Sequence, residues 1–111
     1  MEYELIFYSK CSTAVKGLAL LEANGIKPKI INYFNDRLSH ADLKSLAQKV
    51  GSVKAIIREK TAKELGVSLE QDDDALLSAI ADEPKLLQRP ILIKGDKAIV
   101  GRPIEEMLKL I

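Results

Sequence analysis

Runs of residues that favour β-strands occur near the two ends of the chain, and this distribution is the strongest constraint on the fold. Two runs lie in the N-terminal part, at residues 3–8 and 28–33, and two in the C-terminal part, at 91–94 and 97–100. The segment Lys94-Gly95-Asp96-Lys97 is typical of a turn, so the last two runs form a predicted β-hairpin. We expect a mixed four-stranded sheet in which strands from both ends of the chain meet centrally.

In the rest of the sequence, apolar residues recur at the spacing of an α-helix. Residues 11–24 form a predicted helix that Gly25 stops, with Ser12 and Thr13 as candidate capping residues. Pro103 fits the first position of a last helix, which continues to the end of the chain.

The middle of the chain is predicted to be helical throughout. A capping box at Ser39 and Asp42 starts one helix, which Gly51 ends, and residues 53–66 indicate two brief helical pieces. Three aspartates at 72–74 favour another helix start before Pro84. This order of strands and helices along the chain predicts an α/β fold of the thioredoxin-like class: a mixed four-stranded sheet flanked by helices and carrying a helical insertion.

Size and charge exclude several classes of protein. A chain of 111 residues with 47% hydrophobic and 30% charged residues predicts a single domain over residues 1–111. A net charge of +1 disfavours nucleic-acid binding. We expect no signal peptide and no membrane segment, and the lone cysteine fits the reducing cytoplasm. We also expect a monomer.

Cys11 lies between the end of a predicted strand and the start of the first predicted helix. The unpaired N–H groups and partial positive charge of a helix N-terminus stabilise a thiolate over a thiol. Cys11 is therefore a predicted nucleophile, although a lone cysteine is more often a small buried apolar residue. Position 14 is Ala, so a second thiol has to come from glutathione or a partner protein.

Arginine is scarce, since the seventeen basic residues include only Arg37, Arg58, Arg89 and Arg102. Arg89 and Arg102 each precede a proline and flank the predicted hairpin, which a thioredoxin-like fold brings next to the start of the first helix. The planar guanidinium fork suits a tetrahedral oxyanion. We expect an anion site beside Cys11 rather than surface ion pairs alone.

Other polar residues are weaker candidates. His40, the one histidine, lies in the capping turn of the second predicted helix and is interpreted as solvated rather than catalytic. The aspartates at 72–74 lack the accompanying ligands of a metal site and are interpreted as a solvated helix start. We expect no metal and no tightly bound cofactor.

Four segments carry a further signal: Ile6-Phe7-Tyr8-Ser9-Lys10-Cys11-Ser12-Thr13, Ala55-Ile56-Ile57-Arg58, Leu87-Gln88-Arg89-Pro90-Ile91 and Gly101-Arg102-Pro103. In these segments the chain resembles the ArsC family of glutaredoxin-dependent arsenate reductases, to which the Spx-type regulators are related. The resemblance extends from about residue 4 to residue 111.

The resemblance implies roles for four residues. Cys11 would attack arsenate or a similar oxyanion, and Arg58, Arg89 and Arg102 would hold the oxyanion and stabilise the thiolate. Glutathione, as a co-substrate, would attack the arsenic adduct, and glutaredoxin would resolve the product to release arsenite. The resemblance also implies a cis peptide bond before Pro90.

Three functions remain open at this point: an arsenate reductase, a glutathione-linked thiol oxidoreductase with another substrate, and an Spx-like regulator that binds RNA polymerase. The resemblance favours an enzyme over a regulator, because Ala14 removes the Cys-x-x-Cys switch of Spx proteins and Arg102 matches an arginine that they lack. Arsenate-dependent turnover would separate the first function from the other two.

Overall fold

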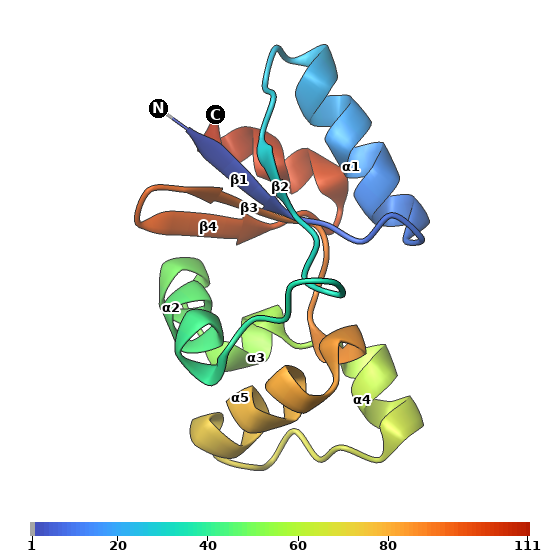
Figure 1. Cartoon of the computed structure of the whole chain (residues 1–111), viewed down its shortest axis with the longest axis vertical. Helices are drawn as coiled ribbons and strands as arrows, with labels where there is room; N and C mark the ends of the chain where they lie inside the picture. The colour runs from blue at the N-terminus through green and yellow to red at the C-terminus, as the bar shows by residue number, and fades with distance from the viewer. Residues whose placement is uncertain (1) are drawn as a thin grey trace. The chain divides into compact units, whose positions relative to one another are not determined.

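The computed structural model describes residues 2–111, which divide into two compact units (Figure 1). The chain up to Asp36 and from Arg89 onward forms the first, called here the sheet unit. Arg37–Gln88 forms the second, the helical unit, which corresponds to the predicted insertion between the second and third strands. The prediction of one domain over residues 1–111 stays a prediction.

The sheet unit contains a four-stranded sheet in the order β2-β1-β3-β4. Its strands are β1 (Tyr3–Ile6), β2 (Lys29–Ile31), β3 (Ile91–Lys94) and β4 (Lys97–Val100). β1 pairs with β2 in parallel and with β3 antiparallel, and β3 and β4 form the predicted hairpin. The two central strands come from opposite ends of the chain, which confirms the predicted thioredoxin-like class.

One face of this sheet is covered by the helix α1 (Ser12–Ala23) and by the 3-10 helix η2 (Ile104–Leu110), drawn in red in Figure 1. Leu5 and Leu92 are cross-strand partners and pack with Leu21 of α1 and Met107 of η2, all four fully buried. This apolar layer fixes α1 against the sheet and so determines where Cys11 lies.

Two glycines allow α1 and the segment after β4 to pack closely against Pro90, just before β3. A Cβ atom on Gly17 of α1, or on Gly101 after β4, would lie 2.9 Å from Cγ of Pro90 and equally close to Met107. Because a proline ring cannot rotate away, a larger residue at either position would push these segments apart.

The peptide bonds before Pro90 and Pro103 are cis, the first as the family resemblance implies.

Three details differ from the sequence-based expectation. β1 and β2 are shorter than predicted, because residues 7, 8, 28, 32 and 33 lie outside the strand pairing. The N-cap of α1 is Cys11 itself, not Ser12 or Thr13, since the helix begins one residue earlier than a hydroxyl cap would require. Pro103 is the N-cap of the last helix rather than its first residue, and that helix is 3-10.

The helical unit consists of α2 (His40–Val50), α3 (Val53–Ile56), α4 (Glu59–Leu65), α5 (Asp73–Asp82) and the 3-10 turn η1 (Pro84–Leu86). The predicted capping box is present, since Ser39 and Asp42 each accept the other's backbone N–H. Buried aliphatic side chains form the core of this unit: Leu43, Leu46, Ile56, Leu76, Leu77, Ile80 and Leu86. Among residues 2–111, no helix is long and apolar enough to cross a membrane.

Candidate active site

Cys11 occupies the N-cap position of α1, at the end of a short loop that leaves β1. Its backbone N–H donates to the Tyr8 carbonyl at 3.0 Å, and its carbonyl accepts from Val15 N–H at 3.1 Å as the first bond of the helix. These bonds fix the backbone on both sides of a half-buried side chain. The thiol is thus held at the positive end of the helix, as the sequence predicted.

Arg102 and Arg89 both interact with the Cys11 sulfur. Nη2 of Arg102 lies 3.7 Å from Sγ, and Nε of the same side chain donates to the Arg89 carbonyl at 3.0 Å. The Arg89 side chain hydrogen-bonds to the Cys11 sulfur. The two arginines come from the two ends of the hairpin, whose antiparallel pairing brings residues 89 and 102 to the same edge of the sheet.

The pKa of the Cys11 thiol lies below its ordinary value. Partial burial raises the pKa, but the backbone N–H of Ala14, the hydrogen bond from Arg89 and the positive charges of Arg89 and Arg102 lower it by more. The stabilising groups act on the charged form, so the sulfur gains thiolate character near neutral pH. This is the direction that the helix position and the arginine pair predict.

Three aromatic residues, two of which contact Arg89, were not identified as site residues from the sequence. Nη1 of Arg89 donates to the Tyr33 hydroxyl at 3.3 Å, and the guanidinium carbon lies 5.5 Å from the ring centre of Tyr8. Phe34 stacks on Tyr8 with 3.9 Å between ring centres and contacts Tyr33 at 4.8 Å. We call Tyr8, Tyr33 and Phe34 the aromatic frame.

A topological signal would have found the aromatic frame. Tyr8 follows β1, and Tyr33 and Phe34 follow β2. Because β1 and β2 are parallel neighbours, residues beyond their carboxyl ends emerge at one edge of the sheet. Tyr8 and Tyr33 fall inside the strands predicted from the sequence, so the prediction does not show this relationship.

Arg58 belongs to the helical unit and is the N-cap residue of α4. Its backbone N–H donates to the Leu86 carbonyl at 2.7 Å, and its Nη1 donates to Oγ1 of the buried Thr61 at 2.9 Å. The first contact fixes the backbone of Arg58 and the second its side chain, and both partners belong to the helical unit. The expectation that Arg58 shares an anion with Cys11 stays a prediction.

The weaker polar candidates all lie in the helical unit. Nε2 of His40 is 2.9 Å from Oδ1 of the exposed Asp74, an ion pair between α2 and α5 when the histidine is protonated. Asp72 caps α5, accepting from Ala75 N–H at 2.9 Å, in line with its interpretation as part of a helix start. Within residues 2–111, no group of three or more His, Cys, Asp or Glu side chains is arranged to hold a metal ion.

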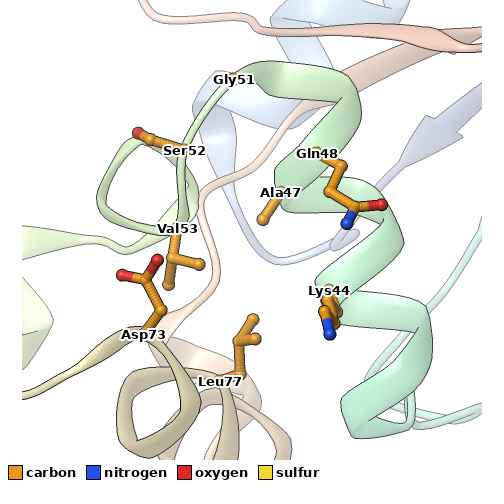
Figure 2. A pocket seen from close by; sticks show the side chains of 8 residues that line it. All are labelled: Lys44, Ala47, Gln48, Gly51, Ser52, Val53, Asp73 and Leu77. Atoms are coloured by element: carbon orange, nitrogen blue, oxygen red, sulfur yellow. The ribbon is translucent and has the colours of Figure 1, made fainter.

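A hollow of about 210 Å³ opens among α2, α3 and α5 (Figure 2). Ala47, Val53 and Leu77 give it an apolar lining, and Lys44 and Asp73 supply opposite charges. None of its lining residues is a strong nucleophile or an arginine. The hollow therefore lacks the thiol and the guanidinium groups that lie together at Cys11.

The groups at Cys11 are a thiol with a lowered pKa and two guanidinium groups that can bind an anion. A thiolate attacks electrophilic centres, and guanidinium groups beside it neutralise negative charge on an incoming oxyanion. The described residues supply one thiol, so a reduction that forms a disulfide needs a second thiol from another molecule. The arrangement suits covalent thiol chemistry on an anionic substrate.

Comparison with known proteins gives consistent matches over nearly the whole chain. The family model described as the ArsC family matches residues 7–110. A protein of Neisseria meningitidis named arsenate reductase is 39% identical over 111 residues, covering 96% of this chain and 95% of the relative. The solved structure of an arsenate reductase from Vibrio cholerae superposes with a TM-score of 0.90 at 39% identity and covers 100% of this chain and 98% of that one. A Bacillus subtilis relative named regulatory protein MgsR is 31% identical and covers 99% of this chain and 92% of the relative.

Proposed function

Because the chain belongs to the ArsC family, we propose that it is a thiol-dependent arsenate reductase whose nucleophile is Cys11. The observation that carries the proposal is the pairing of the Cys11 sulfur with the guanidinium groups of Arg89 and Arg102 at the start of α1. The Neisseria meningitidis relative and the Vibrio cholerae protein, both named arsenate reductase, add support, since each aligns with nearly the full length of this chain.

In the first step, the Cys11 thiolate attacks the arsenic atom of arsenate. An oxygen leaves as water after protonation, and a sulfur–arsenic bond forms while arsenic is still As(V). Arg89 and Arg102 hold the remaining oxygens, because bidentate guanidinium groups match their geometry and charge. From the family resemblance alone, we assign a third oxyanion contact to Arg58.

In the following steps, external thiols supply the two electrons. Glutathione displaces another oxygen and forms a second sulfur–arsenic bond, and the thiol of glutaredoxin then attacks the glutathione sulfur. This attack forms the mixed disulfide and breaks the bond between the glutathione sulfur and arsenic, whose electron pair stays on arsenic and reduces it to As(III). Water then cleaves the remaining sulfur–arsenic bond, which releases arsenite and returns the Cys11 thiol. The balance is arsenate plus two thiols giving arsenite, one disulfide and water. Both thiols are abundant in the cytoplasm, which we propose as the site of the reaction.

A regulatory binding function is the second candidate, favoured by the similarity to the protein named regulatory protein MgsR. A disulfide switch within the loop at Cys11 is excluded by Ala14, because one sulfur cannot close a disulfide on itself. The enzymatic proposal uses the thiol and both arginines, whereas a binding role leaves them without a chemical task.

The test is a coupled assay of the purified protein with arsenate, glutathione, glutaredoxin, glutathione reductase and NADPH. We expect NADPH oxidation that depends on arsenate, on this protein and on glutaredoxin. Replacement of glutaredoxin by thioredoxin and thioredoxin reductase identifies the thiol partner. Absence of arsenate-dependent turnover with both thiol systems would reject the reductase proposal and favour a different thiol substrate or a regulatory function.

A further inference from the structure

Arg89 is an unusual residue in this protein, because it is a charged side chain with only 6% of its surface exposed. Burial of a charge is costly unless the charge is paired and hydrogen-bonded. Around Arg89 the Cys11 sulfur supplies the opposite charge, the Tyr8 ring supplies a π-face, and the Tyr33 hydroxyl accepts from Nη1 at 3.3 Å. Each of these contacts restricts the orientation of the guanidinium plane.

We propose that Tyr33 is a positioning residue, whose buried hydroxyl holds the Arg89 guanidinium in the orientation that faces the Cys11 sulfur. The proposal deepens the proposed function and rests on it for its catalytic meaning, because Arg89 is the group that acts on thiolate and oxyanion. Tyr33 acts through Arg89 and has no direct contact with substrate assigned to it.

The chemistry of the acceptor is what suits Tyr33 to this role. An aspartate or glutamate at the same place would also accept from Nη1, but its negative charge would neutralise Arg89 and compete with the thiolate. A phenol oxygen accepts the hydrogen bond and leaves the positive charge available for the sulfur or an anion. Burial raises the pKa of Tyr33 to about 12, so the phenol stays neutral across the pH range in which a thiolate enzyme works.

The position of Tyr33 is itself fixed by packing. Tyr33 is 2% exposed, its ring contacts Phe34, and Phe34 stacks on Tyr8, whose ring lies beside Arg89. The aromatic frame and Arg89 therefore form a closed series of contacts anchored to the ends of β1 and β2. Because this packing leaves the Arg89 side chain few alternative rotamers, the one weak hydrogen bond to Tyr33 is enough to select the orientation of the guanidinium group.

The test is the substitution Tyr33→Phe, which removes the hydroxyl oxygen and keeps the ring. Cys11 reactivity is measured as the rate of iodoacetamide alkylation against pH, and its midpoint reports the thiol pKa. We expect the midpoint to rise by about 0.5 unit, equivalent to roughly threefold less thiolate below the midpoint. Tyr3→Phe is the matched control, since Tyr3 pairs with Lys94 at the other end of β1, and its midpoint should equal that of the unsubstituted protein.

A double-substitution cycle with Arg89→Lys decides whether Tyr33 acts through Arg89. Lys cannot present the same fork to hydroxyl and sulfur, so Tyr33→Phe should shift the midpoint much less in the Arg89→Lys background. An equal shift in both backgrounds would overturn the proposal. A lowered melting temperature with an unchanged midpoint in Tyr33→Phe would also overturn it, by showing that Tyr33 is structural only.

These measurements separate the proposal from the reductase function. Alkylation of Cys11 needs no arsenate, glutathione or glutaredoxin, so the Tyr33 effect is measurable in a protein that reduces no arsenate. A normal Tyr33→Phe midpoint in a protein that does reduce arsenate would leave the reductase function standing and reject the positioning role.

Discussion

The helices α1 and α2 begin with different chemistry. At α2, Ser39 accepts the Asp42 N–H at 3.1 Å, and the Asp42 carboxylate accepts the Ser39 N–H at 3.0 Å. Ser52 at α3 and Asp72 at α5 also accept a backbone N–H of the first turn. At α1 the same position is Cys11, whose side chain makes no such capping hydrogen bond.

This difference separates stability from reactivity. An oxygen cap satisfies one of the free N–H groups at a helix start and contributes about 1 kcal/mol. A neutral thiol is a poor acceptor, so α1 gains little from its cap until the sulfur ionises. The N–H of Ala14 then stabilises the thiolate and lowers the pKa. The helix start of α1 is built for a charged sulfur, and those of α2, α3 and α5 for helix stability.

The largest effect is expected from Cys11→Ser, which gives α1 the kind of cap that α2 has. Arsenate-dependent NADPH oxidation should fall to background, because a hydroxyl remains protonated at neutral pH and the described contacts of Cys11 include no general base. Far-UV circular dichroism provides the control for folding. Turnover comparable to that of the unsubstituted protein would remove Cys11 from the mechanism.

A smaller effect, on stability alone, is expected from Ser39→Ala. The substitution removes the side-chain acceptor of the Asp42 N–H and should lower the free energy of unfolding by about 1 kcal/mol in urea. The alkylation midpoint of Cys11 should not change, because the thiol is stabilised by residues of the sheet unit. A shifted midpoint would show that the two helix starts are coupled.

The smallest effect is a pH-dependent difference in stability between the unsubstituted protein and Cys11→Ser. The pKa of Cys11 in the folded protein lies below its ordinary value of 9.0, so ionisation stabilises the fold. That contribution is complete above pH 9.0 and is lost as the pH falls through the folded-state pKa.

Cys11→Ser should therefore be the more stable protein in acid, through its oxygen cap, and should lose this advantage toward pH 9. Other titrating groups are common to both proteins and cancel in the difference of the two melting temperatures. A difference that is constant with pH would contradict the lowered thiol pKa.

The fold was predictable where local signals are strong. The hairpin strands at 91–94 and 97–100 and the capping box at Ser39 were identified with their observed positions, because turn residues and caps mark them locally. The strands β1 and β2 were predicted to end two residues later than they do. Tyr8 and Tyr33 have high β-propensity, and no local feature of the sequence shows where strand pairing stops. Likewise, no local signal distinguishes a 3-10 helix from an α-helix at Ile104–Leu110.

By itself, the sequence determined the class of sheet, the lone thiol at a helix start and the two arginines beside prolines. These follow from local propensities and from the types of side chain present. Only the tertiary structure decided that Arg89 is buried, that Arg102 bonds to the Arg89 carbonyl, and that Tyr33 accepts a hydrogen bond from Arg89. The physical reason is that these contacts join residues 13 and 56 positions apart, and their geometry depends on the register and packing of strands that meet only in the folded sheet.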